Sequence, residues 1–510
     1  MPKRIFFYRL TAYAVFVAVS VCNLHAAHVP PVVHSAIGDK SEGVPGKLQI
    51  TNIGKKQQFN GAQKESWDND INSPKSVTFS PDGKKFYVNS LEGGKTVVYD
   101  ALTFEKIAVI NHEFTPATQP ELFAPLSGYY EFIHYPDGAT KAFMGKPVES
   151  SWSHNGRYLW VPYYRRTFDL NAQDPSAIAV IDARDNKIIR VFETGPLPKM
   201  VETSHDGKTL AVTHWGNNTV GFIDISGNDP EKWHHLPPVT IGHKLDLNFS
   251  LTRAVNRDSN SGYLLRGTVF TPDDRYLLIS SMSGPLHVVD MKDREYLGTV
   301  NNMNNIRHLV ISGDYLYGSQ NTGATVLRVN LDSLLNSIDR SKASGVRNIP
   351  VGSPIKSVAV GGGARTLSLT PDGRYAFVAC NSGNALYVVD TETMTVADHI
   401  RCDSYPVGLE LSPDGHRAIV TSQGRSGNGG NAVNIFAIDR FDNFDYEASV
   451  KNSAPSYEAD EITDEDTADS QAIENDTVIS QWPWIWIGIG AAAIIAVIFI
   501  IVLAKRSRKK

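Results

Sequence analysis

The sequence contains little cysteine. Of its three cysteines, Cys22 lies in an N-terminal apolar run, which leaves Cys380 and Cys402 for the remainder of the chain. No pair has the CxxC spacing, so a disulfide scaffold, a structural zinc site and covalently attached haem are not indicated. The HExxH motif, the nucleophile elbow, the phosphate loop and the dinucleotide fingerprint are also absent. The catalytic residues are therefore unknown, and neither a metal site nor a cofactor is predicted.

The chain also lacks an excess of basic residues. It has 49 Lys and Arg against 54 Asp and Glu, which gives a net charge of -5 over 510 residues. Sequence-independent nucleic-acid binding depends on a broad basic surface. We therefore do not expect nucleic acid as a partner.

The N-terminal segment has the order of a secretory signal. Basic residues at positions 3, 4 and 9 precede an apolar run that ends near Ala26 and Ala27. This order is typical of a signal peptide, here residues 1–27, and an uncleaved anchor is the alternative. Residues 28–45 are interpreted as a linker.

The C-terminal end resembles a membrane anchor. Residues 482–504 are uncharged and begin with three tryptophans, and residues 505–510 carry five bases. Such a run is long enough to cross a bilayer as a helix, and the bases favour a cytoplasmic tail. Residues 446–481 are rich in acids and poor in apolar side chains, which predicts a disordered stalk. The ends together predict a single-pass membrane protein with its bulk in the periplasm or outside the cell. Whether the helix is retained or processed stays open.

The central part of the chain, residues 46–445, contains a repeated unit. A run such as Lys75 to Ile110 shows an alternating apolar segment, a Ser-Pro-Asp-Gly turn and three further short apolar segments. Proline, aspartate and glycine each favour a tight turn at these positions. Four short strands per unit, repeated around a ring, is the pattern of a β-propeller blade.

The first residue of the turn defines one anchor for each repeat. The seven anchors are Ser80, Ser153, Ser204, Thr271, Ser312, Thr370 and Ser412. The last repeat shows only three strands, and the alternating segment at residues 46–53 can supply the fourth. The fold class predicted is an all-β, seven-bladed propeller closed by an N-terminal strand, together with one C-terminal transmembrane helix. An eight-bladed ring or a split sandwich is the alternative.

The repeat resembles a known family. The runs 86–89 (FYVN), 375–379 (YAFVA) and 387–390 (YVVD) resemble the YVTN-type β-propeller repeat, over roughly residues 46–440. The resemblance implies a propeller fold and export from the cytoplasm. The wider group includes propeller lactonases, so the resemblance alone implies no reaction.

Alignment of the repeats reveals a basic column. Five residues before the anchors stand Lys75, Val148, Lys199, Arg266, Arg307, Arg365 and Val407, of which five are basic. This position begins the innermost strand of a blade, beside the mouth of the channel. A ring of bases there would attract an anion, and arginine can hold a carboxylate or phosphate through two hydrogen bonds. Inheritance from one ancestral repeat and pairing with neighbouring acids are the alternatives.

A loop expected at the same face adds His214 and Trp215 as candidate ligand contacts. Packing of Trp215 on a neighbouring blade is the alternative. The sequence as a whole predicts a membrane-anchored binding or interaction module for an anionic small molecule, glycan, peptide or partner protein. A lactonase-type hydrolase and a structural surface-layer component are the alternative functions.

Overall fold

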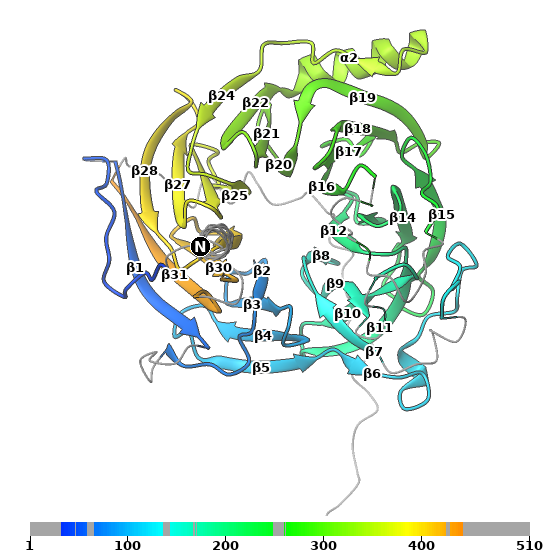
Figure 1. Ribbon diagram of the computed structural model, residues 1–510, viewed down its shortest axis with the longest axis horizontal. Coiled ribbons are helices and arrows are strands. Elements are labelled where there is room, and N and C mark those ends of the chain that lie inside the picture. The colour runs from blue at the N-terminus through cyan, green and yellow to red at the C-terminus, as the bar shows by residue number, and fades with distance from the viewer. Residues whose placement is uncertain are drawn as a thin grey trace, which may run out of the picture. The chain divides into compact units, whose positions relative to one another are not determined.

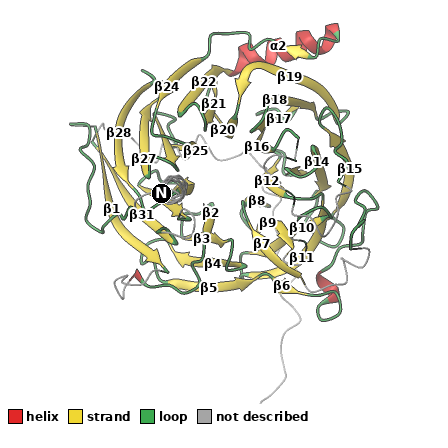
Figure 2. Ribbon diagram, viewed as in Figure 1, coloured by secondary structure: helices red, strands yellow, loops and turns green. Residues whose placement is uncertain are grey.

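Seven sheets surround a central axis in the computed structural model (Figures 1 and 2). It describes residues 32–441, except residues 46, 59–65, 136–142, 167–168, 170, 248–254, 256–259, 261 and 425–428. Each sheet is one blade, and its strands run from the axis to the rim. The predicted all-β, seven-bladed propeller is therefore confirmed.

The first four blades are numbered in chain order. Blade 1 contains β2 (Pro74–Phe79), β3 (Lys85–Ser90), β4 (Lys95–Asp100) and β5 (Lys106–Asn111). Blade 2 contains β6 (Glu113–Phe114), β7 (Phe143–Pro147), β8 (Ser151–Ser153), β9 (Tyr158–Arg166), β10 (Ser176–Asp182) and β11 (Lys187–Thr194), and the 3-10 turn η2 (Pro120–Leu122) precedes β7. Blade 3 contains β12 (Pro198–Thr203), β13 (Thr209–His214), β14 (Thr219–Asp224) and β15 (His234–Thr240). Blade 4 contains β16 (Leu265–Phe270), β17 (Tyr276–Ser281), β18 (Pro285–Asp290), β19 (Glu295–Asn304) and β23 (Asn348–Ile349).

The last three blades complete the ring. Blade 5 contains β20 (Ile306–Ser312), β21 (Tyr315–Gln320), β22 (Thr325–Asn330) and β24 (Lys356–Ala359). Blade 6 contains β25 (Ala364–Leu369), β26 (Tyr375–Cys380), β27 (Ala385–Asp390) and β28 (Thr395–Arg401). Blade 7 contains β29 (Pro406–Leu411), β30 (Arg417–Ser422), β31 (Ala432–Arg440) and β1 (Leu48–Gln57).

The seven predicted anchors all lie at the end of an innermost strand. In blade 1 the Ser80 hydroxyl donates to the Asp82 carboxylate at 2.6 Å and accepts the Lys85 amide at 3.0 Å. Gly83 completes the turn with φ 69°, a conformation that glycine adopts without strain. The same hydroxyl–carboxylate hydrogen bond joins Ser204 to Asp206, Thr271 to Asp273 and Ser412 to Asp414, so the motif builds the same turn in blades 1, 3, 4 and 7.

Pairing between the two ends of the described chain closes the ring. Strand β1 runs antiparallel to β31, with Ile50 opposite Ile438 and Leu48 opposite Arg440. The predicted strand at residues 46–53 therefore supplies the outer strand of blade 7. Leu48 and Ile50 are buried in an apolar cluster that also contains Phe377 and Leu386 of blade 6.

One insertion forms a helix. The segment between β22 and β23 contains α2 (Leu331–Ser344). Asn330 caps the helix by accepting the Ser333 amide at 2.9 Å, and Gly345 ends it in the left-handed conformation. Leu334 and Ile338 are buried, and the helix contacts β23 of blade 4 and β21 and β22 of blade 5.

The predicted membrane segment lies outside the described residues, as do the signal peptide and the acidic stalk. Among the described residues, no helix is both long enough and apolar enough to span a bilayer.

The closure can be tested by removing side-chain volume from β1. Ile50 is fully buried, and we expect Ile50→Ala to lower the free energy of unfolding by about 2–5 kcal/mol, because it leaves a cavity between blades 6 and 7. Ile53 is 38% exposed on the same strand, so Ile53→Ala is the matched control, expected within about 0.5 kcal/mol of the parent. Denaturant unfolding of the full chain measures both values. Equal effects of the two substitutions would contradict the closure.

Candidate functional site

The basic column lies on β-bulges in the innermost strands. Pairing with the second strand shifts register around Lys75, Lys199, Arg266, Arg307 and Arg365, and also around Val407. A bulge leaves a residue out of the ladder and redirects its side chain. Six of the seven blades therefore interrupt their pairing at the column that the sequence singled out.

The backbone before each bulge is also unusual. The residue two positions before the column has a positive φ in the same six blades. These residues are Ser73, Leu197, Leu264, Asn305, Gly363 and Tyr405, with φ between 50° and 75°. For a leucine or tyrosine this conformation costs about 1–3 kcal/mol, and such strain clusters at functional sites. The repeated geometry holds the column at one level of the ring.

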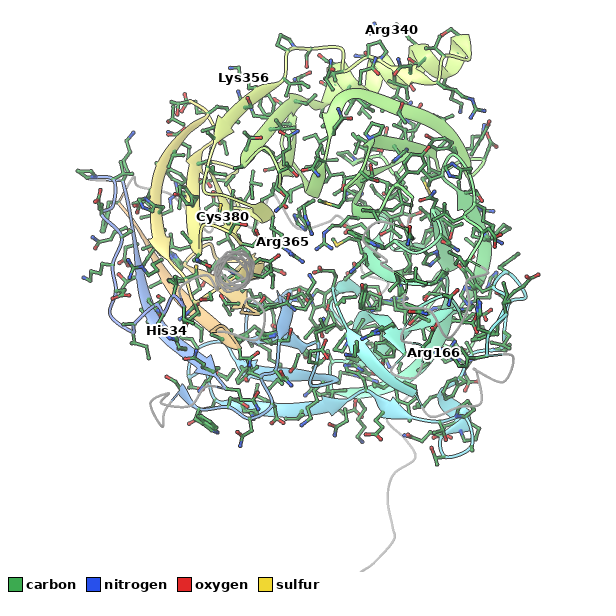
Figure 3. The ribbon with its side chains drawn as sticks, in the orientation of Figure 1. His34, Arg166, Arg340, Lys356, Arg365 and Cys380 are labelled. Atoms are coloured by element: carbon green, nitrogen blue, oxygen red, sulfur yellow. The ribbon has the colours of Figure 1, made fainter. Side chains whose placement is uncertain are left out.

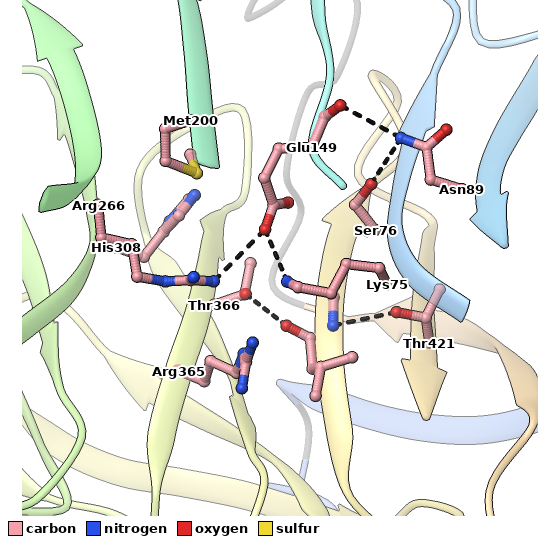
Figure 4. Close-up of polar contacts among 12 residues, drawn as sticks. Lys75, Ser76, Asn89, Glu149, Met200, Arg266, His308, Arg365, Thr366 and Thr421 are labelled. Carbon is pink, nitrogen blue, oxygen red and sulfur yellow. Dashed lines mark hydrogen bonds and ion pairs between the residues drawn. The ribbon is translucent and has the colours of Figure 1, made fainter. Parts of the chain in front are cut away.

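Four charged side chains meet at the hub (Figure 4). Lys75 Nζ lies 2.8 Å from Glu149 Oε1, and Arg266 Nη2 lies 3.4 Å from the same oxygen. Arg365 also acts electrostatically on Lys75, Arg266 and Glu149, and it points toward the middle of the ring (Figure 3). Three cationic groups thus share one carboxylate.

Burial determines the pKa values of this cluster. It lowers the pKa of Lys75 well below the usual value, and Glu149 opposes this while Arg365 and Arg266 add to it. Burial together with the field of Arg365 lowers the pKa of Arg266 to about 10. For Glu149 burial alone would raise the pKa, but Lys75 and Arg266 outweigh it and lower the pKa. Glu149 is therefore a stable anion and a weak base.

The two arginines have donors that the hub does not satisfy. Arg266 and Arg365 are 3% and 7% exposed. Within the described part of the chain, Nε of neither side chain has a hydrogen-bond acceptor. Arg365 does form a hydrogen bond with Tyr405, the residue in the left-handed conformation before the blade 7 bulge. The hub therefore combines excess positive charge with unused N–H groups.

The other predicted contacts lie around this cluster. Lys199 Nζ is 3.6 Å from the ring centre of Tyr164 and 4.8 Å from that of Trp215, which is a cation–π arrangement. Trp215 is buried in an apolar cluster with Leu197 and Leu264, which agrees with the packing alternative. Lys199 therefore packs over two aromatic rings.

His214 and Arg307 are placed differently. His214 is fully buried inside blade 3, where Nε2 accepts the Gly195 amide at 3.1 Å and Nδ1 lies 2.8 Å from the Thr219 hydroxyl. Burial lowers its pKa to about 3, so the ring is neutral. Arg307 is half-buried on the β20 bulge. The structure thus brings Lys75, Arg266 and Arg365 together, places Lys199 over the rings of Tyr164 and Trp215, and buries His214 within its blade.

Glu149 is a hub residue that the sequence analysis missed. It follows Val148 of the basic column and lies in a break between β7 and β8, the two pieces of the innermost strand of blade 2. A signal was present, because blade 2 has no base in the column and carries an acid one position later. The break lets its carboxylate reach a base of blade 1 and a base of blade 4.

Hydroxyl groups on the second strands fix neighbouring blades at the hub. Thr213 donates to the Arg266 carbonyl at 3.2 Å, and Ser319 donates to the Arg365 carbonyl. Gly408 allows a similar approach between blades 7 and 1, because a Cβ there would lie 2.7 Å from the Lys75 carbonyl oxygen. The main chain of the basic column is therefore held by adjacent blades.

A cavity of about 380 Å³ occupies the axis next to the cluster. Glu149 and His308 line it at the level of the hub, and Glu202 and Glu410 line it closer to the turn anchors. No described His, Cys, Asp and Glu side chains form a group of three or more that could hold a metal ion. Cavity volumes of this size suit small molecules.

Removal of the hub carboxylate tests the charge cluster. We expect Glu149→Gln to lower the free energy of unfolding by about 3–5 kcal/mol near neutral pH, because it leaves Lys75 and Arg266 buried without a counter-charge. The pKa of Glu149 is lowered from 4.5 in the fold, so the lost contribution is present above pH 4.5 and disappears as the pH falls through the folded pKa. Unfolding curves from pH 3 to 8 measure this. Glu231→Gln, at an exposed position, is the control. A difference in free energy of unfolding between the parent and Glu149→Gln that does not depend on pH would contradict the assignment.

Comparison with known proteins supports the fold and a distant relationship. No family model matches the chain. Antigen Lp49 of Leptospira interrogans serogroup Icterohaemorrhagiae serovar copenhageni is 25% identical over 180 residues, which are 31% of this chain and 36% of that protein. The match therefore spans about a third of the relative.

Two solved structures show a similar arrangement. A chain of Kuenenia stuttgartiensis hydrazine synthase superposes with a TM-score of 0.50 at 15% identity, over 74% of this chain and 98% of that chain. The Cps50 (Swd1) β-propeller domain of Myceliophteria thermophila gives a TM-score of 0.48 at 14% identity, over 72% and 96% of the two chains. At 15% identity the likeness to the hydrazine synthase chain concerns the fold alone.

Proposed function

We propose that the chain is a binding module whose hub holds an anionic group, either a carboxylate or a phosphate. The single observation that carries the proposal is the cluster of Lys75, Arg266 and Arg365 around one carboxylate. Buried like charges raise each other's free energy, and an anion in the hub would relieve that cost. Both arginines also carry a buried Nε–H group that has no acceptor among the described residues.

The surroundings of the cluster favour a small anion. The hub lies beside an axial cavity, where water is limited and a charge–charge interaction is stronger than at an open surface. Arginine forms two parallel hydrogen bonds with a carboxylate or phosphate. The lowered pKa of Glu149 disfavours it as a general base.

Anion binding can be measured by calorimetry on the full chain, with citrate and inorganic phosphate as probes. Arg365→Gln removes one cation and leaves the ion pair between Lys75 and Glu149 intact, so we expect binding of the better probe to weaken about tenfold or more. Arg184 is a matched control, because its side chain is 68% exposed on the outside of blade 2. Arg184→Gln should bind as the parent does. Absence of binding by the parent, or equal binding by Arg365→Gln, would refute the proposal.

We also propose that the propeller is exported and held at a membrane by residues 482–504. This proposal is supported by the order of charges in the two terminal segments. Bases precede the first apolar run, and five bases follow the last apolar run. The propeller would then present its hub to ligands outside the cytoplasm.

Fractionation of cells that express the chain tests this second proposal. The full chain is expected in the membrane fraction, and a chain that lacks residues 482–510 is expected in the soluble fraction. A chain that lacks only residues 446–481 is the control and should stay with the membrane. Recovery of the full chain as a soluble protein would contradict the anchor.

A further inference from the structure

The axial cavity is lined by hydrogen-bonding groups of the innermost strands. Glu202 on β12 and Glu410 on β29 stand two residues before the anchors of blades 3 and 7. Both line the cavity, and both side chains are partly exposed. No Lys or Arg belongs to the described residues that line it, since Lys75 and Arg266 contact Glu149 but lie outside the lining. The cavity therefore differs in chemistry from the cluster of bases.

The two glutamates are protonated at pH 7. Burial raises the pKa of Glu202 to about 8, and His205 opposes this shift. Burial also raises the pKa of Glu410 to about 8, which the hydrogen bond from Thr78 opposes and the charge of Glu202 reinforces. A protonated carboxyl group has one O–H donor and keeps acceptor capacity. Each glutamate can therefore both donate to a neutral ligand and accept from it.

Two other titratable side chains line the cavity. Glu149 is an anion that Lys75 and Arg266 compensate. Burial lowers the pKa of His308 to about 4, so its ring is neutral at pH 7. The lining thus carries one compensated negative charge, and its other polar groups are neutral.

Three serine hydroxyls in the lining have unused donors. Asn89 Nδ2 donates to Ser76 at 3.0 Å (Figure 4) and to Ser150 at 2.9 Å. The Leu411 amide donates to Ser368 at 3.3 Å. Each hydroxyl accepts one of these hydrogen bonds, and none of the three donates to another described residue. A hydroxyl also has one donor, so each serine can donate to a ligand oxygen.

The volume and the remaining lining define the size of the ligand. The cavity measures about 380 Å³. At ~30 Å³ per water this is room for about a dozen water molecules, which is comparable to the number of non-hydrogen atoms in a monosaccharide. Val77, Leu367 and Leu409 add apolar surface to the lining. Such surface suits the C–H groups of a sugar or cyclitol ring, and pockets of this volume hold small molecules.

Other classes of ligand fit this lining less well. An anion would meet the Glu149 carboxylate without a base in the lining. A cation would meet two protonated carboxyl groups at pH 7, and Glu149 is already compensated by two bases. An apolar molecule would leave the hydroxyl donors without acceptors, which costs free energy in a buried site.

We propose that the axial cavity binds a neutral polyol of monosaccharide size, whose hydroxyl groups exchange hydrogen bonds with Glu202, Glu410 and the three serines. This site goes beyond the anion site proposed at the hub, because its lining contains no base among the described residues. The serines donate to ligand oxygens, and the carboxyl groups donate and accept.

Probes of one ring size test the proposal on the full chain at pH 7. Calorimetry compares myo-inositol with cyclohexanol, which has the same carbon ring and one hydroxyl group. We expect myo-inositol to bind at least about tenfold more tightly, because cyclohexanol can satisfy few of the polar groups in the lining. Equal affinity for the two rings, or no binding of myo-inositol, would refute the proposal.

Variants distinguish a protonated carboxyl group from an ionised one. The double variant Glu202→Leu/Glu410→Leu removes both polar groups and should weaken binding of myo-inositol about tenfold or more. Glu202→Gln/Glu410→Gln keeps a donor and an acceptor at each position, so its affinity at pH 7 should lie within about threefold of the parent. Glu392→Leu, at a side chain that is 78% exposed, is the control. Equal losses in the glutamine and leucine variants would contradict the assignment.

The pH dependence of binding gives a second readout. Between pH 7 and 9 the parent should lose about tenfold in affinity for myo-inositol, because carboxyl groups with a pKa of about 8 ionise and lose their O–H donors. The glutamine double variant should show no such loss. A parent affinity that stays constant over this range would refute the role of the two glutamates. Phosphate binding, measured on the same samples, tests the hub separately.

Discussion

The pairing of β1 with β31 is the interaction on which the hub depends. This ladder joins the first and last described strands, and it places blade 7 beside blade 1. Only then does the main chain of Gly408 lie against the Lys75 carbonyl. In a closed ring the innermost strands surround the axis. The side chains that they direct inward must therefore meet there, whatever their charge. The fold therefore forces like charges together that an open sheet would keep apart.

The hub tolerates this repulsion through a small number of contacts. Glu149 compensates two of the bases, and the hydroxyls of Thr213 and Ser319 hold the main chain of Arg266 and Arg365. The strained residues before each bulge show that packing between blades determines the backbone here. Buried charges that are only partly compensated contribute little to stability.

The sequence predicted the elements that depend on local chemistry. The Ser-Pro-Asp-Gly turns, the seven anchors and the closing strand follow from turn residues and alternating side chains, which act within a few positions. The basic column was also visible, because repeats place equivalent residues at equivalent sites. Glu149 was missed because its role depends on a break in blade 2 and on contacts with blades 1 and 4, which no local pattern encodes. Helix α2 was missed as well, although Asn330 and Gly345 are ordinary capping residues, because it lies within an insertion between strands.

Because local patterns do not encode contacts between blades, only some of the predicted site residues meet at the hub. Lys199 belongs to the basic column, yet its ammonium lies over the rings of Tyr164 and Trp215. The position of a residue in the column determines where its side chain leaves the strand, and contacts with the neighbouring blade determine where its charged group lies. The acids that line the axial cavity follow the same rule, because Glu202 starts on blade 3 and Glu410 on blade 7, yet Glu202 raises the pKa of Glu410. Their interaction is a property of the assembled ring, which neither repeat encodes alone.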